Sequence, residues 1–139
     1  MTTTEPQRTR IEPPVTPTSQ PFWDATRRKE LQLPWCNECG KPFWFPRDLC
    51  PNCLSDDIEW RPARGTGTVY SCSTMARAAN PLMADRAPYV VALVELEEGP
   101  RMMTNIVGCD PSEVRVGQAV RVTWEELSDG RNIALFEPV

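Results

Sequence analysis

The second half of the chain alternates apolar and polar residues with the period of two that half-buried strands require. The pattern is strongest in the segment 89–96, where Val90, Ala92, Val94 and Leu96 fall on one face. Five segments read as strands, separated by turn sequences rich in Gly, Pro, Ser and Asp: 65–73, 89–96, 102–107, 116–125 and 133–136. We therefore predict a mainly β fold, with no long helix in this half.

Five short antiparallel strands in so few residues predict a small closed barrel, and the OB-fold is the leading candidate. Gly65 and Gly67 flank the start of the first strand, where glycines favour a bend or bulge at a barrel corner. The four apolar residues on one face of the 89–96 strand would fill the barrel.

Proline and polar residues dominate the start of the chain. Residues 1–18 predict a flexible tail or linker, because they lack the apolar side chains of a core. The next segment predicts a short helix capped by Ser19 and ending near Lys29, with Pro21 tolerated in the first turn. Phe22 and Ala25 would form its buried stripe, together with the neighbouring Trp23 and Thr26.

Four cysteines occur in two pairs with the spacing of a metal site: Cys36, Cys39, Cys50 and Cys53. Two residues within each pair let a tight turn aim both thiolates at one point, and two facing turns complete a tetrahedral site. Gly40 suits the left-handed conformation in which such a turn often ends. Zinc is the commonest occupant, and a closed four-sulfur site leaves no position for substrate, so its expected role is structural.

Two disulfides are the alternative for these cysteines, but disulfides belong to oxidising compartments. The N-terminus lacks the features of a signal peptide, and no apolar run reaches the length of a membrane span. We therefore expect a cytoplasmic protein with reduced thiols, which favours a metal. Iron stays open as an alternative to zinc, since a rubredoxin has the same kind of site.

The residues between the two cysteine pairs, Lys41 to Arg47, are aromatic and bounded by prolines. Together with a short strand over 31–35 they predict a zinc ribbon. About thirty residues bury too little apolar surface to fold alone, and structural zinc offsets that deficit by roughly 10–16 kcal/mol in small peptides. We expect Trp44 and Phe45 to cover the metal site. The predicted organisation is a tail over 1–18, helix and ribbon over 19–64, and barrel over 65–139.

Charge and composition exclude several kinds of protein. The 139 residues carry a net charge of −4, and the barrel segment 67–139 holds six basic and ten acidic residues. A nucleic-acid binder needs a basic stripe, so binding of single strands through the ribbon or barrel is a minor alternative. The chain contains no histidine, which removes the commonest general base and any Ser–His or Cys–His pair. A self-sufficient enzyme is therefore not favoured.

The order of these elements, and several short strings within them, resemble the acyl-CoA-associated proteins of the domain of unknown function 35 family. The resemblance covers about 19–139. Its carriers are Phe22-Trp23, Leu33-Pro34-Trp35-Cys36-Asn37-Glu38-Cys39-Gly40, Pro46-Arg47 before Cys50-Pro51-Asn52-Cys53, Gly65-Thr66-Gly67-Thr68-Val69-Tyr70-Ser71, Pro88-Tyr89-Val90-Val91-Ala92-Leu93-Val94 and Phe136-Glu137-Pro138-Val139. One departure is Leu54, which follows the last cysteine where the family often has glycine.

This resemblance implies a rubredoxin-like zinc ribbon joined to an OB-fold, in an accessory subunit without catalytic residues of its own. The implied partner is a thiolase-fold acyl-CoA enzyme, in particular an aldolase that cleaves a steroid side-chain CoA thioester by retro-aldol chemistry. Alternative partners are the pair of thiolase and hydroxymethylglutaryl-CoA synthase, or a hotdog-fold enoyl-CoA hydratase. We expect no membrane partner and no nucleic acid.

Two further sets of residues are candidates for contacts. Apolar residues outside the expected core would contact the partner subunit: Phe22, Trp23, Tyr89, Val91 and Leu93. The alternatives are that the two helix aromatics pack on the ribbon, and that the ribbon or the connection 75–88 covers the strand. A cationic and aromatic set near the junction of ribbon and barrel would contact CoA: Trp44, Arg47, Arg61 and Arg64. The alternative is that these arginines pair with nearby acidic residues: Asp48, Asp56, Asp57 and Glu59.

Overall fold

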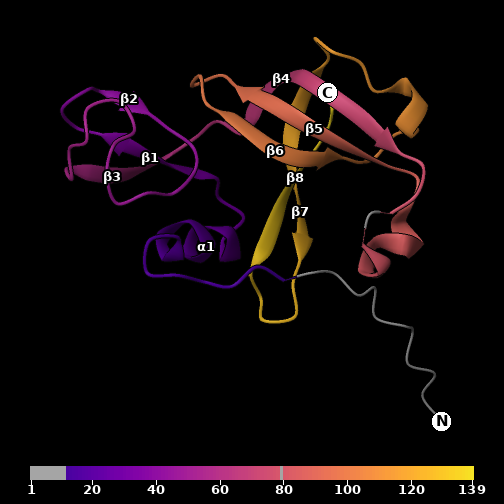
Figure 1. The fold of residues 1–139 in the computed structure, drawn as a ribbon, viewed down its shortest axis with the longest axis horizontal. Helices are drawn as coiled ribbons and strands as arrows, with labels where there is room; N and C mark the ends of the chain where they lie inside the picture. Colours follow the sequence, from indigo (N-terminus) through magenta and orange to yellow (C-terminus); the bar gives the residue numbers. More distant parts are fainter. Residues whose placement is uncertain (1–11, 79) are drawn as a thin grey trace.

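The structure, a computed structural model, describes residues 12–78 and 80–139. A helix and a small sheet form one side of the molecule, and a closed barrel forms the other (Figure 1). The predicted fold class, a ribbon followed by a five-stranded OB-type barrel, is confirmed. No helix in the described part of the chain is long and apolar enough to cross a membrane.

The first part consists of α1 (Gln20–Arg27) and a three-stranded antiparallel sheet in the order β2-β1-β3. Its strands are β1 (Gln32–Cys36), β2 (Lys41–Pro42) and β3 (Ile58–Pro62). Residues 37–40 and 43–57 connect these strands as turns and loops. Because this sheet is small, we expect the fold of the first part to depend largely on the cysteine turns.

The barrel closes in the order β4-β5-β6-β8-β7. Its strands are β4 (Thr66–Met75), β5 (Tyr89–Leu96), β6 (Arg101–Ile106), β7 (Ala119–Glu126) and β8 (Asn132–Pro138). All five predicted strands are present, each within a few residues of its predicted bounds. Two short 3₁₀ turns, η1 (Pro81–Arg86) and η2 (Pro111–Glu113), lie in the connections.

The predicted bend at the start of β4 is present. Gly65 has φ of +77°, and a β-bulge follows between Val69 and Ser71. Gly67 lies so close to β5 that a Cβ there would collide with the Glu95 carbonyl oxygen. These features let β4 curve from β5 on one side to β7 on the other and close the barrel.

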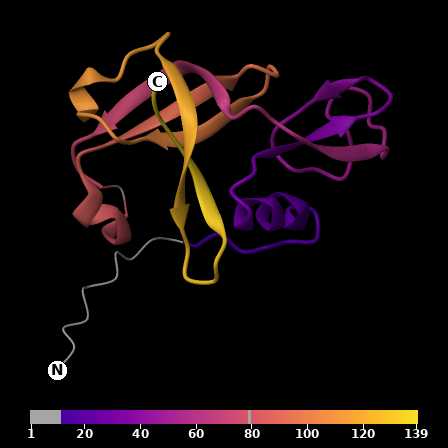
Figure 2. The same cartoon turned by 180° about the vertical axis from the view of Figure 1, so that it is seen from behind.

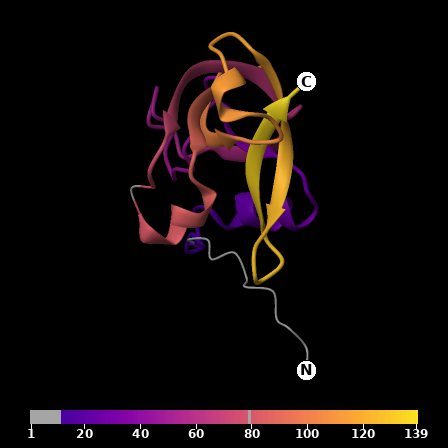
Figure 3. The same ribbon diagram turned by 90° about the vertical axis from the view of Figure 1, so that its right-hand side faces the viewer.

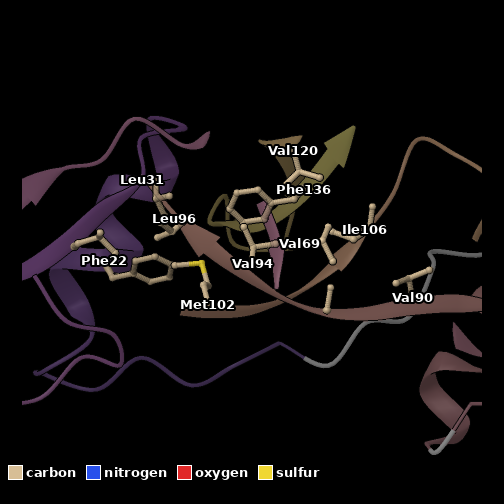
Figure 4. Packing of buried hydrophobic residues seen from close by; sticks show 12 residues of the cluster. Phe22, Leu31, Val69, Val90, Val94, Leu96, Met102, Ile106, Val120 and Phe136 are labelled. Atoms are coloured by element: carbon tan, nitrogen blue, oxygen red, sulfur yellow. The ribbon is translucent and has the colours of Figure 1, made fainter. Parts of the chain in front are cut away.

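One apolar core runs through both parts. The predicted barrel-facing residues of β5 are all buried, from Val90 to Leu96, and Phe136 of β8 packs among them. Phe22 of α1 joins the same cluster, and its ring is directed at Met102 of β6 (Figure 4). The helix therefore packs against the barrel as well as against the ribbon.

The β7–β8 hairpin extends beyond the barrel, and its tip lies beside α1 (Figures 2 and 3). Arg27 donates a hydrogen bond to the Asp129 carbonyl at 2.6 Å. Residues 12–18, which we call the strap, also contact this hairpin. The Glu12 carboxylate accepts hydrogen bonds from the Ser128 backbone at 2.8 Å and hydroxyl at 2.7 Å. The earlier part of the predicted tail, residues 1–11, lies outside the described residues.

The prediction that the Ser19 side chain caps the helix is wrong. Ser19 stands at the N-cap position but makes no side-chain hydrogen bond to the helix. Its hydroxyl instead accepts the Thr16 backbone N–H at 3.0 Å, because residues 16–19 form a tight turn that engages it. The helix also ends at Arg27, two residues earlier than predicted, and Lys29 adopts φ of +55° just beyond.

Candidate metal centre and the adjoining groove

The four cysteines meet at one end of the ribbon sheet. Cys36 ends β1, Cys39 lies in the turn to β2, and Cys50 and Cys53 lie in the loop that leads to β3. Their Sγ atoms all lie within 4.8 Å of one another. The Sγ–Sγ distance is 3.6 Å between Cys36 and Cys53 and 3.9 Å between Cys39 and Cys50. A tetrahedron with Zn–S bonds of 2.3 Å has edges of about 3.8 Å, so the sulfur positions fit a four-thiolate metal site.

The backbone of both cysteine turns supports negative charge on sulfur. The Cys39 N–H donates to Cys36 Sγ, and the Asn52 N–H donates to Cys50 Sγ, each at 3.4 Å. Gly40 ends the first turn at φ of +68°, as its position predicted. Leu54 occupies the equivalent place in the second turn at φ of +63°, a left-handed conformation that disfavours a Cβ. The departure noted in the sequence therefore leaves the turn intact.

Without a bound cation, the four cysteine side chains do not all favour the thiolate form. The hydrogen bond with Cys53 and, after it, burial raise the pKa of Cys39 to about 12. For Cys50, burial opposes ionisation, but the backbone N–H groups of Cys53 and Asn52 bring the pKa down to about 7. Cys50 thus favours the thiolate form, whereas Cys39 favours the thiol form. A bound metal removes that conflict, because each thiolate then faces a cation.

An apolar groove lies where α1, the ribbon loop and the barrel meet. Its volume is about 760 Å³. Its walls come from five elements. Its principal residues are Trp23 of α1, Trp44, Phe45 and Arg47 of the loop, Leu93 of β5, Met103 of β6 and Ile133 of β8. The loop residues were expected to cover the metal site. Trp44 packs on Phe22, with ring centroids 4.9 Å apart, and also lies beside Pro51 and Asn52 of the second cysteine turn, whereas Phe45 is 64% exposed and lines the groove.

The structure separates the four residues predicted to contact CoA. Trp44 and Arg47 share the groove, and no described side chain forms an ion pair with Arg47. Arg61 lies on β3, where it pairs with Glu59 at 3.0 Å and lies over the Trp35 ring. Arg64 pairs with Glu97 at 3.1 Å beyond the ribbon. Two of the three arginines therefore already have carboxylate partners.

The residues predicted to contact a partner also lie in different parts of the structure. Phe22, Trp23 and Leu93 line the groove, and Phe22, which is only 7% exposed, also belongs to the core. Tyr89 lies at the other end of β5, beside a separate cavity of about 350 Å³ next to η1. Val91 pairs with Asn105 of β6 and Ser73 of β4 on the outer face of the barrel.

Sequence reasoning missed Met103, which is 71% exposed and lies directly opposite Leu93 in the β5–β6 pairing. Extending the alternation of β5 across the turn to β6 would have placed these two residues side by side. Arg101 was also missed. It stacks over Tyr70 at 3.6 Å and pairs with Glu95, at the edge of the groove.

Two family models match consecutive parts of the chain. The ChsH2 rubredoxin-like zinc ribbon domain matches residues 23–59, and the ChsH2 C-terminal OB-fold domain matches residues 60–125. Both matches agree with the folds seen in the structure. The ribbon match also agrees with the cluster of four sulfur atoms.

Some similar proteins are much longer than this chain. A probable enoyl-CoA hydratase alpha subunit of Thermomonospora curvata is 37% identical over 118 residues, which is 84% of this chain and 36% of that protein. The 3-oxo-4,17-pregnadiene-20-carboxyl-CoA hydratase alpha subunit of Mycobacterium tuberculosis is 33% identical over 108 residues, 78% of this chain and 34% of that protein. The chain thus spans about a third of each hydratase subunit.

Other similar proteins match over nearly their whole length. A DUF35 domain-containing scaffold protein of Methanothermobacter thermautotrophicus is 33% identical over 83% of this chain and 86% of its own. Among solved structures, a chain of the Ltp2–ChsH2(DUF35) aldolase is 34% identical, covers 91% of this chain and 98% of its own, and superposes with a TM-score of 0.81. The chain belongs to the DUF35 family of ChsH2-type zinc-ribbon and OB-fold proteins.

Proposed function

We propose that this chain is a non-catalytic accessory subunit that binds and stabilises a thiolase-fold acyl-CoA enzyme. Its partner would be an aldolase that cleaves a steroid side-chain CoA thioester by retro-aldol chemistry. The observation that carries this proposal is the likeness to the ChsH2(DUF35) aldolase chain, which extends over 98% of that chain. The steroid-CoA name of the Mycobacterium tuberculosis relative supports the substrate class.

The residues of the chain support an accessory role. The sequence has no histidine. Where the pKa of a carboxylate is shifted, as in Glu97 and Asp110, it is lowered. Hydrogen bonds from Thr66 and Arg64 lower the pKa of Glu97, and those from Ser112 lower the pKa of Asp110. A general acid needs its pKa raised toward neutrality. The partner enzyme would therefore supply the nucleophile and the acid–base groups.

The metal in this proposal is zinc, held by Cys36, Cys39, Cys50 and Cys53 in a structural site. Four cysteine ligands close the coordination shell and leave no position for substrate. The ion would hold the loop 43–47 in the ribbon, since that loop lies between the two cysteine pairs. Iron in the same ligand set is the alternative.

We propose that the partner enzyme, and not this chain, binds CoA. The CoA phosphates need several cations, and two of the candidate arginines, Arg61 and Arg64, are engaged by Glu59 and Glu97. Of the three candidate arginines, Arg47 alone combines a guanidinium without an ion-pair partner among the described residues with a place in the groove. This ion pairing supports the alternative that the arginines serve the fold and the surface.

A second candidate partner is a hotdog-fold enoyl-CoA hydratase. The names of the two hydratase alpha subunits favour it, but each is about three times as long as the aligned segment. An assay separates the two candidates. The chain is purified with a thiolase-like subunit and, separately, with a hydratase subunit from the same genome. Retro-aldol cleavage of a steroid side-chain β-hydroxyacyl-CoA by the first pair, at a rate that the thiolase-like subunit alone does not reach, supports the proposal. Stimulation of hydration only, by the second pair, contradicts the aldolase assignment.

A further inference from the structure

Two of the most exposed large apolar side chains of the chain lie together in the groove. Phe45 is 64% exposed and Met103 is 71% exposed, and they come from different parts of the structure, the ribbon loop and β6. Burying a side chain of this size removes apolar surface from water and so lowers the free energy of the folded protein. The isolated fold gains little of this free energy from either residue. A contiguous exposed apolar surface of this kind is typical of a binding site.

The walls of the groove are held in place before any ligand binds. Trp44 packs on Phe22, which is part of the core, so the loop is fixed to α1. Leu93 and Met103 face each other in the regular β5–β6 ladder. A preformed groove binds with a smaller loss of conformational entropy than one that must order on binding. Aromatic and methionine side chains also suit the docking of an apolar polypeptide segment.

The charge at the edge of the groove restricts what fits it. Arg47 and Arg101 are the two ionisable residues that line it. Arg47 has no ion-pair partner among the described residues, and Arg101 is paired with Glu95 at the surface. One unpaired cation beside a large apolar surface complements an apolar segment with a flanking carboxylate. It does not complement a ligand with several phosphates.

We propose that this groove binds a segment of the thiolase-fold partner, which inserts apolar side chains between Phe45 and Met103 and places a carboxylate against Arg47. This inference rests on the proposed function and names the surface through which the accessory subunit acts. The residues that carry it are Trp23, Trp44, Phe45, Arg47, Leu93 and Met103. Arg61, Arg64, Tyr89 and Val91 lie outside this surface.

The test measures the dissociation constant of the complex between the full chain and the thiolase-like subunit. The groove variant is the double substitution Phe45→Ala and Met103→Ala. A matched control is Leu54→Ala with Val116→Ala, which are 71% and 68% exposed and lie outside the groove. We expect the groove variant to weaken binding at least about tenfold, since truncating central contacts costs more than 1 kcal/mol each. The control should stay within about twofold of the wild type. Both variants should unfold at the wild-type temperature, because their side chains are exposed.

A charge reversal, Arg47→Glu, tests the carboxylate contact. It should weaken the complex, and this contact should then make the affinity rise with salt and not fall, because salt screens the repulsion that replaces the attraction. Wild-type affinity in the groove variant overturns the inference but leaves the accessory role standing. Unchanged affinity with a raised KM for acyl-CoA assigns the groove to CoA and also overturns it. If the wild-type chain forms no complex, the inference and the proposed function both fail.

Discussion

Thr26 and Asn132 join the helix to the barrel through two buried hydrogen bonds. The Thr26 hydroxyl accepts the Asn132 backbone N–H at 3.2 Å, and the Asn132 amide donates to the Thr26 carbonyl at 2.9 Å. Both side chains are buried. The contact spans 106 positions of sequence and fixes α1, one wall of the groove, against β8.

Replacing Thr26 with valine should destabilise the chain. Valine keeps the shape of the side chain but removes the hydroxyl, so the buried Asn132 N–H loses its acceptor. An unsatisfied buried donor costs about 1–3 kcal/mol, and we expect the free energy of unfolding in urea to fall by that amount. The control Thr68→Val, on an exposed position of β4, should stay within about 0.5 kcal/mol of the wild type. Equal stability of the two variants would show that the hydrogen bonds contribute nothing.

The strap should lose its contact with the β7–β8 hairpin at acid pH. Hydrogen bonds from the Ser128 backbone and hydroxyl lower the pKa of Glu12 from 4.5. Because the folded pKa is lowered, the contact contributes stability above the unfolded pKa and loses it as the pH falls through the folded pKa. The Ser128 amide resonance in NMR spectra should therefore titrate with a midpoint below 4.5.

The variant Glu12→Gln should abolish that titration of Ser128. The Ser112 amide is an internal control, because it donates to Asp110 at 2.9 Å, far from the strap. Its resonance should keep titrating in Glu12→Gln as in the wild type. A Ser128 titration that persists in the variant would mean that another group causes it.

Glycine at position 54 should stabilise the ribbon. Leu54 has φ of +63° and is largely exposed, so its side chain strains the backbone and buries little. Removing the Cβ at a left-handed position gains up to about 1 kcal/mol, less the greater freedom of glycine in the unfolded chain. The midpoint of chelator-induced unfolding of the ribbon should rise. Leu49→Gly, at a residue of the same loop without a positive φ, should lower it. A lowered midpoint in Leu54→Gly would contradict the role given to this backbone conformation.

Removing the metal should unfold the ribbon and weaken the partner complex. The loop that carries Trp44, Phe45 and Arg47 lies between the cysteine pairs, so loss of the metal releases one wall of the groove. Elemental analysis should find zinc in the purified chain, which should be colourless. Cys36→Ser should lose the metal and weaken partner binding, whereas Cys72→Ser, in the barrel strand β4, should retain the metal. A red protein containing iron would overturn the zinc assignment.

The sequence allowed most of the fold to be predicted because two signals in it are strong. Cysteine spacing located the ribbon, and the alternation in β5 located the buried face from Val90 to Leu96. Single-residue chemistry was harder to predict. Ser19 has the right residue type for a cap, but a tight turn with Thr16 engages its hydroxyl first. Such competition depends on the path of the chain before the helix, which local pattern does not reveal.

The groove could be predicted only in part, because its walls are far apart in sequence. Trp44 and Arg47 were grouped correctly as neighbours in the loop. Arg61 and Arg64 were grouped with them by proximity in sequence, yet Arg61 pairs with Glu59 on β3 and Arg64 pairs with Glu97 after β5. Met103 joins the groove through the β5–β6 register, and Ile133 through the position of β8 beside α1. The alternation of β5, extended across the turn, indicates the place of Met103, but the local sequence does not reveal the place of Ile133.

The central claim is that this chain acts by binding a thiolase-fold subunit. The most direct test is sedimentation velocity of an equimolar mixture of the two purified proteins at micromolar concentration. A single species heavier than either protein, with absorbance from both, is the predicted result. Two species that sediment as each does alone would contradict the claim.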